Sequence, residues 1–201
     1  MKKWIVLLFA LLTMPVVAQE FHFIPKVGLN IANMTKLEGD VRPGVNVGFA
    51  AEFPVAPSFA IEPGLYYSMQ GTKDSEDGLK ATLQTDYLNI PIYAKFYAYE
   101  GFHLFAGPQF GFNVRSKAKV SSSGTALSTD FKDYINTFDF SLGIGAGYQF
   151  DMGLLISANY NIGLTNAIKA DALKSDLTAD WKKHDLDSHH GVFQITLGWR
   201  F

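Results

Sequence analysis

The chain has 201 residues, of which 48% are hydrophobic and 18% are charged, as is typical of a folded protein rather than a disordered one. This length favours a single domain. The absence of cysteine excludes disulfide frameworks and cysteine-ligated metal sites. A formal net charge of −2 argues against a nucleic-acid-binding protein.

The first residues have the three regions of a secretory signal peptide. Lys2 and Lys3 precede an apolar run over 4–12, and small residues end the segment at Ala18. We therefore predict a cleaved signal peptide over 1–18 and one mature domain over 19–201. Cleavage would remove Lys2 and Lys3, leaving 15 basic against 19 acidic residues and a formal charge of −4. The expected product is exported and mildly acidic.

Beyond this segment no apolar run reaches the ~18 residues of a membrane helix, and apolar residues alternate with small polar ones instead. The clearest case is 138–150, where Leu142 and Ile144 fall on one side and Ser141 and Gly145 on the other. A period of two predicts a β-strand. The same alternation occurs in seven other segments: 21–32, 45–53, 59–70, 88–97, 104–115, 154–163 and 193–201.

The sizes of the side chains on the two faces indicate what surrounds these strands. The polar face carries mainly Gly, Asn, Ser and Ala, which suit the narrow interior of an eight-stranded barrel. The other face carries Phe, Leu and Ile, which suit lipid. We therefore predict an all-β fold, an eight-stranded antiparallel transmembrane β-barrel. A soluble lipocalin-like binder or a β-sandwich shares the alternation and stays the alternative. On this assignment, Gly145→Ser on the lumen face should be milder than Ile144→Arg on the lipid face.

The connections alternate in length along the chain. Short turns are expected at 54–58, 99–101 and 151–153, and longer loops at 33–42, 72–80, 116–136 and 165–190. Outer-membrane barrels pair short periplasmic turns with long outer loops, so both termini should be periplasmic. Aromatic residues gather at the predicted periplasmic ends, as expected of an interfacial girdle: Phe21, Phe23, Phe53, Phe59, Phe96, Phe102, Phe150 and Trp199.

Several stretches resemble an outer-membrane β-barrel family of Bacteroidetes that includes porin-family and PorT-like proteins and is similar to OmpX-like and OmpA-like barrels. They are 87–96 (YLNIPIYAKF), 106–111 (AGPQFG), 138–140 with 143–150, and 160–164 (YNIGL). This resemblance covers nearly the whole mature chain and implies the fold and a bacterial outer-membrane location. It is weak for activity, because such proteins share the barrel and differ in their loops.

The last strand resembles the signal that the barrel-assembly machinery recognises. It ends on an aromatic residue, with apolar residues at every second position before it: Phe193, Ile195, Leu197, Trp199 and Phe201. Any lipid-facing strand alternates in this way, so the terminal Phe is the more specific part. The resemblance implies that the assembly machinery is a partner.

Seven charged residues fall on the predicted lumen face: Lys26, Glu52, Glu62, Lys95, Arg115, Asp139 and Arg200. Because an isolated buried charge is costly, we expect them to pair and to plug the lumen. Lys26, Lys95 and Arg115 are the expected partners of Glu52, Glu62 and Asp139. An ion path is the alternative.

The predicted last loop contains imidazole and carboxylate groups, in His184, Asp185, Asp187, His189 and His190. They could bind a divalent metal, but no regular spacing closes a site, and a hydrated loop is the simpler interpretation. Ser188 beside His189 does not have the geometry of a hydrolase pair. We therefore expect no metal site, no cofactor and no enzymatic activity.

Together these features predict a monomeric barrel of the porin family with a structural or surface-interaction role. Its expected partners are outer-membrane lipid, lipopolysaccharide and the assembly machinery. The alternatives are a PorT-like secretion accessory, a narrow pore and, as an enzyme, a lipid-modifying barrel.

Overall fold

The computed structural model describes residues 21–34, 40–76, 79–122, 125–130, 135–165 and 190–201. The predicted signal peptide and its cleavage site lie outside these residues. In the described part of the chain, no helix is long and apolar enough to cross a membrane.

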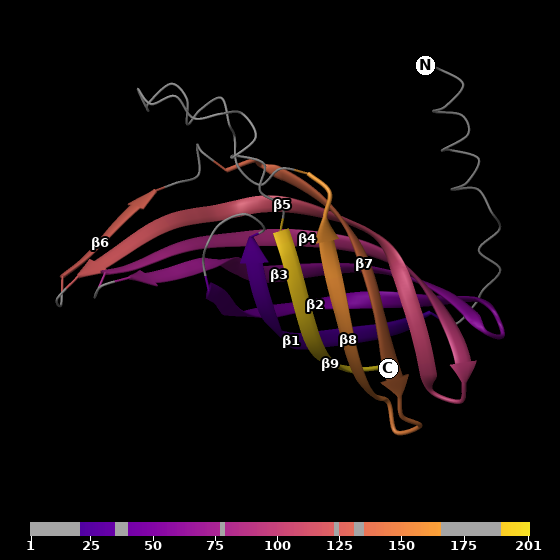
Figure 1. The fold of residues 1–201 in the computed structure, drawn as a ribbon. Coiled ribbons are helices and arrows are strands. Elements are labelled where there is room, and N and C mark those ends of the chain that lie inside the picture. The colour runs from indigo at the N-terminus through magenta and orange to yellow at the C-terminus, as the bar shows by residue number, and fades with distance from the viewer. Residues whose placement is uncertain (1–20, 35–39, 77–78, 123–124, 131–134, 166–189) are drawn as a thin grey trace, which may run out of the picture.

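The described residues form nine β-strands (Figure 1). Their bounds are β1 His22–Met34, β2 Asp40–Ala56, β3 Phe59–Glu76, β4 Leu79–Tyr99, β5 Phe102–Ser122, β6 Thr125–Asp130, β7 Phe138–Gln149, β8 Leu154–Gly163 and β9 His190–Trp199.

Eight of these strands form a closed antiparallel barrel, which confirms the predicted fold class. Each barrel strand pairs with its neighbours in the order β1, β2, β3, β4, β5, β7, β8 and β9, and β9 returns to β1. The ninth strand, β6, pairs with the end of β5 and is not part of the ring. Closure satisfies the backbone hydrogen bonds that an open edge would leave unpaired in lipid.

Side chains alternate between the two surfaces of the wall as the sequence predicts. On β7, Ile144 is 59% exposed on the outer surface, whereas Ser141 on the lumen side is 3% exposed. The outer surface is apolar along every barrel strand. The lumen side is lined by small, amide and charged residues, together with buried aromatic side chains such as Tyr87, Tyr93 and Phe105. The barrel therefore has its apolar face outside and its polar face inside, as an outer-membrane barrel requires.

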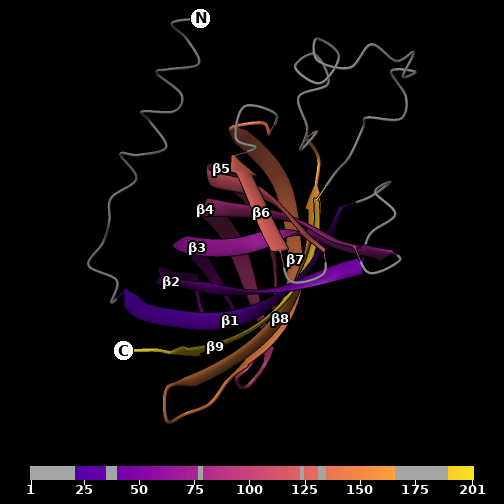
Figure 2. The ribbon, with the colours of Figure 1, turned by 90° about the vertical axis from the view of Figure 1, so that its left-hand side faces the viewer.

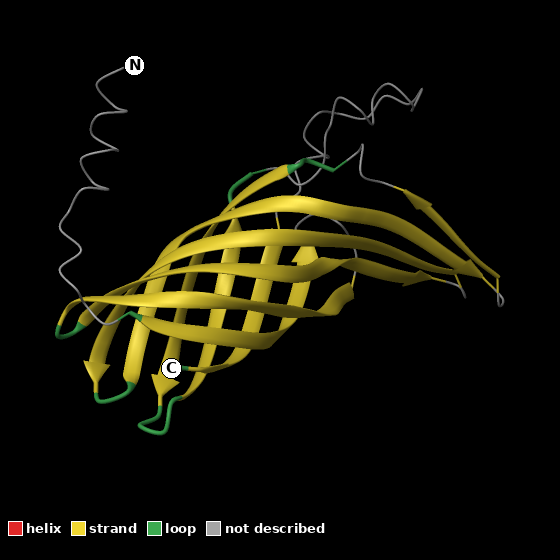
Figure 3. Ribbon diagram, turned by 180° about the vertical axis from the view of Figure 1, so that it is seen from behind, coloured by secondary structure: helices red, strands yellow, loops and turns green. Residues whose placement is uncertain are grey.

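One end of the barrel has short connections. The turns after β2, β4 and β7 lie at this end, together with the start of β1 and the end of β9 (Figure 3). We call it the turn end, and the rule for outer-membrane barrels predicts that it is periplasmic.

At the opposite end, the loop end, several strands are longer than predicted. β3 continues to Glu76 and β4 begins at Leu79, so most of the loop expected over 72–80 is paired strand. The loop expected over 116–136 likewise contains the end of β5 and all of β6. These parts are dominated by charged and hydroxyl residues. Their few apolar residues alternate only over a short stretch, which gives a weak strand signal: Leu79, Ala81 and Leu83 on β4, and Ala118 and Val120 on β5.

The longer strands give the barrel an asymmetric shape. Figure 1 shows the loop ends of β3, β4 and β5 extending with β6 beyond the ends of β1, β8 and β9, and in Figure 2 they point towards the viewer. A membrane strand needs about 9–11 residues, whereas β4 and β5 each have 21. We refer to the shared extension of β3, β4, β5 and β6 as the outer sheet.

Candidate functional site in the barrel lumen

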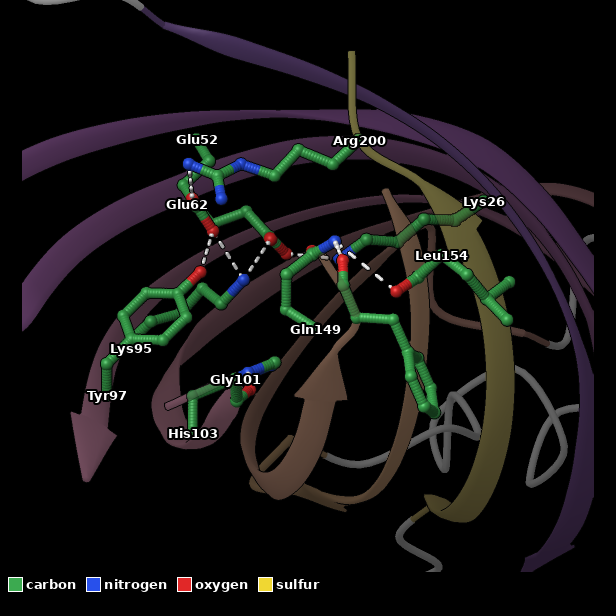
Figure 4. Close-up of polar contacts among 11 residues, drawn as sticks. Lys26, Glu52, Glu62, Lys95, Tyr97, Gly101, His103, Gln149, Leu154 and Arg200 are labelled. Atoms are coloured by element: carbon green, nitrogen blue, oxygen red, sulfur yellow. Dashed lines mark hydrogen bonds and ion pairs between the residues drawn. The ribbon is translucent and has the colours of Figure 1, made fainter. Parts of the chain in front are cut away.

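A cluster of charged side chains crosses the lumen near the turn end (Figure 4). The Lys95 ammonium group lies 2.5 Å from Glu52 Oε2 and 3.1 Å from Glu62 Oε2. Lys26 Nζ lies 2.5 Å from the other oxygen of Glu62. These contacts join β1, β2, β3 and β4, because inward positions of neighbouring strands face one another across a lumen of this size.

Two further side chains, those of Arg200 and Tyr97, contact Glu52 on the side of the turn end. Arg200 Nη2 lies 3.5 Å from Glu52 Oε1. The hydroxyl of Tyr97 donates to Glu52 Oε2 at 2.6 Å, and Lys95 Nζ lies 5.4 Å from the centre of the Tyr97 ring. We call Lys26, Glu52, Glu62, Lys95 and Arg200 the lumen ion cluster.

The lumen ion cluster contains three cations and two carboxylates. The side chains of Glu52 and Lys95 are each 1% exposed, so both charges depend on protein partners rather than on water. Removing one member of a buried ion pair usually costs about 3–5 kcal/mol, since it leaves an uncompensated charge. The cluster is therefore held together as a unit on the side of the lumen formed by β1, β2, β3 and β4.

A second polar layer lies on the loop side of the lumen ion cluster and consists of amides. Asn30 Oδ1 accepts hydrogen bonds from Asn46 Nδ2 at 3.0 Å and from Gln194 Nε2 at 2.8 Å. Gln194 Oε1 accepts from Asn159 Nδ2 at 3.0 Å and from Asn161 Nδ2 at 2.9 Å. This amide layer links β2, β1, β9 and β8. It was not predicted from the sequence, although repeated Asn at inward positions was the available signal.

Little free volume remains between these layers. A cavity of about 30 Å³ is bounded by Lys26, Glu62, Tyr93 and Gln194, among others. It has room for two or three water molecules at most, since one water needs roughly 10–15 Å³. A larger space of about 960 Å³ opens at the turn end, with Glu52 and Arg200 in its lining.

Two predicted members of the charge network lie elsewhere. Arg115 was expected inside the lumen, but its side chain is 51% exposed on the outer surface and lies 3.9 Å from Asp86 Oδ2. A β-bulge causes the difference: Asp86 pairs with Arg115 and Tyr87 pairs with Asn113, so β5 has an extra residue at this point. The predicted inward position of Arg115 is therefore wrong.

Asp139 does face the lumen, and it is 8% exposed. Its Oδ1 accepts a hydrogen bond from Thr165 Oγ1 at 2.9 Å, towards the loop end. Among the described residues, the ion pairs of the lumen ion cluster include neither Asp139 nor Arg115. The expected pairing of Asp139 with a lumen cation is therefore wrong.

The residues of the predicted assembly signal form one row on the outer surface of β9. Their exposed fractions run from 38% at Phe193 to 49% at Leu197, with Ile195 and Trp199 between, and Phe201 is 70% exposed at the turn end. Phe201 N donates to the carbonyl of Phe23 at 3.0 Å, so the end of this row is fastened to β1.

The residues considered for metal binding or hydrolysis, His184, Asp185, Asp187, Ser188 and His189, lie outside the described residues. His190 begins β9. Within the described ranges, no group of three or more His, Asp or Glu side chains is arranged to hold a metal ion.

Comparison with solved structures supports the same fold. Neisserial surface protein A is 10% identical, with a TM-score of 0.52 over 90% of this chain and 97% of that chain. CarO of Acinetobacter baumannii is 12% identical, with a TM-score of 0.50 over 88% of this chain and 97% of that chain. At these identities the likeness shows the fold alone. No curated protein has significant sequence similarity to this chain.

A family model described as "Outer membrane protein beta-barrel domain" matches residues 17–169, which is more than half of the chain. This match agrees with the closed barrel, the apolar outer surface and the polar lumen, and it supports a location in the bacterial outer membrane. The chain therefore belongs to the outer membrane protein beta-barrel domain family.

Proposed function

We propose that this protein is a non-conducting outer-membrane barrel of the porin family with a structural or surface-interaction role. The observation that carries the proposal is the filled lumen. The lumen ion cluster and the amide layer cross it one above the other, and the cavity between them is about 30 Å³. A continuous water path needs more space than this.

The outer sheet supports a role at the cell surface. β4 and β5 continue well beyond the length that lipid requires, and their ends form hydrogen-bonded hairpins rather than unpaired loops. A hydrogen-bonded extension on the loop side offers a surface to molecules outside the cell. Outer-membrane lipid and the barrel-assembly machinery are the partners that this proposal includes, and the active form is a monomer.

A narrow pore is the alternative that the lumen geometry addresses most directly. The test is conductance of the purified wild-type protein in a planar bilayer, after heat-modifiable mobility has shown that it is folded. The expected result is a baseline without steps at either polarity. Steady single-channel steps would overturn the filled-lumen proposal and favour the pore.

A PorT-like secretion accessory and a lipid-modifying enzyme would each leave a different defect in cells that lack the protein. The accessory role predicts a secretion defect with an intact surface. The enzyme predicts altered outer-membrane lipid. From the proposed role we expect unchanged outer-membrane lipid and unchanged secretion, and a change in the binding of external molecules to the cell surface.

A further inference from the structure

The β-bulge in β5 changes the face on which the following residues lie. Asn113 is 4% exposed in the lumen, Val114 is 44% exposed outside, and Arg115 is again exposed outside. Ser116 then returns to the buried side. One extra residue in a strand reverses the in–out alternation of all residues after it.

Three basic residues follow at alternate positions and so share the outer face. Arg115, Lys117 and Lys119 lie opposite Asp86, Gln84 and Thr82 of β4, respectively. Without the bulge, the parity of the preceding residues would direct all three towards the lumen. On the lumen side the interleaved residues Ser116 and Ala118 are uncharged.

The position of this basic row relative to the membrane follows from strand geometry. The lipid-facing residues of β5 run from Phe102 to Val114. At ~3.4 Å per residue and a tilt of about 40°, this stretch rises about 30 Å along the membrane normal, enough to cover the ~25 Å apolar band of an outer-membrane barrel and part of its interfacial girdles. Arg115 is therefore placed where the hydrocarbon of the outer leaflet ends and lipid headgroups begin.

Acidic residues near the row balance it only in part. Asp86 accepts a hydrogen bond from Tyr67 at 2.7 Å and lies 3.9 Å from Arg115. In the register, Asp130 of β6 is opposite Lys117. In the register, Lys119 has uncharged residues on both sides, Thr82 of β4 and Ser128 of β6. Beyond Thr82 the same row continues to the exposed Lys73 of β3 and then to Asp40 of β2. Among the residues that the structure describes, the row therefore has four basic residues against three acidic ones, a small excess of positive charge.

We infer that Arg115, Lys117 and Lys119 bind the phosphate groups of an anionic glycolipid in the outer leaflet. The site is continuous with the apolar outer surface, so one ligand places its acyl chains against β4 and β5 and its phosphates against the basic row. Guanidinium and ammonium groups are the usual protein partners of phosphate. This site depends on the outer-membrane location and not on whether the lumen conducts.

The test uses the folded full-length mature barrel in a zwitterionic detergent, titrated with bisphosphorylated lipid A, with bound lipid counted by native mass spectrometry. Wild type is compared with the triple variant R115Q/K117Q/K119Q after both show heat-modifiable folding. We expect the triple variant to bind about 100-fold more weakly. Equal affinities would overturn the site.

A charge-preserving variant separates position from net charge. A118K/K119A moves one lysine to the lumen side of the same strand, and it should bind as weakly as K119Q. Wild-type affinity of A118K/K119A would show that the face does not matter and would overturn the proposal.

Two further arms identify the source of the phosphate. Lipid A without phosphates should bind wild type no better than the triple variant binds the phosphorylated lipid. Inorganic phosphate at the same phosphate concentration should not displace the lipid. If the dephosphorylated lipid binds as tightly as the phosphorylated form, or if inorganic phosphate displaces the latter completely, the glycolipid headgroup is not the ligand of this row.

Discussion

The ammonium group of Lys95 lies 2.5 Å from Glu52 Oε2, and both side chains are almost completely buried in the lumen. The two residues are 43 positions apart in the chain and come from β4 and β2. β2 and β4 are separated by β3 in the wall, so this ion pair joins two strands that share no backbone hydrogen bonds with each other.

Replacement of Lys95 by Met should destabilise the barrel by about 3–5 kcal/mol, because Glu52 and Glu62 lose a shared buried cation. The measurement is the midpoint of guanidinium unfolding in lipid vesicles. The control is Asp151→Asn in the exposed turn after β7, which removes a charge outside the cluster and should change the stability by less than about 0.5 kcal/mol. Equal losses in the two variants would contradict a stabilising role for the lumen ion cluster.

Replacement of Gln194 by Leu should cost about 1–3 kcal/mol, since the amides of Asn159 and Asn161 lose their common acceptor. The same unfolding assay checks this value. Ser157→Ala, on the lumen side of β8, serves as a control that removes a hydroxyl outside the amide layer. A loss no larger than that of the control would show that water replaces the missing amide.

Replacement of Ile144 by Arg places a charge on the outer surface near the middle of the membrane, with an expected cost of about 2–4 kcal/mol. The yield of refolding into lipid vesicles measures the effect. Thr196→Ser on the lumen side is the control and should refold like wild type. If Ile144→Arg also refolds like wild type, the outer surface does not face lipid at this position.

Gly145→Ser is expected to be milder than Ile144→Arg, but the structure leaves little room for a side chain at Gly145. A β-carbon at this glycine would lie 2.5 Å from the carbonyl oxygen of Ala158 and 2.5 Å from Cζ of Phe105. The backbone must move to accept it, so Gly145→Ser should reduce the refolding yield markedly as well. Phe105→Leu should restore part of the yield by removing the ring, and no restoration would place the conflict at the backbone of β8 alone.

Deletion of Phe201 should impair assembly in cells more than refolding in detergent. The deletion removes an exposed aromatic residue and one hydrogen bond to Phe23, but it leaves the ladder between β9 and β1 in place. The measurement is the fraction of heat-modifiable protein in the outer membrane, beside the same fraction after refolding in vitro. Phe201→Tyr is the control that keeps an aromatic end. Equal cellular fractions for the deletion and wild type would show that the terminal Phe carries no assembly information.

The local sequence pattern alone was sufficient to predict the architecture of the barrel. The period of two in 138–150 and the contrast between Ile144 and Ser141 depend only on which residues are neighbours in the chain, so they predict strands, faces and a lipid-facing barrel. The prediction stopped where charged and hydroxyl residues predominate, as at 116–122 on β5. Strand pairing continues there, but only Ala118 and Val120 keep the apolar alternation, which is too short to predict a membrane strand.

Only the tertiary structure decided which inward charges meet, because ion pairs depend on the register between strands that are far apart in sequence. Lys95 reaches Glu52 across the lumen, whereas the extra residue beside Asn113 turns Arg115 out to the surface. A bulge leaves no mark in composition or spacing, yet it reverses the face of every later residue in its strand. The same holds for Gly145, whose small size is required by Phe105 and Ala158, contacts that exist only after the barrel closes.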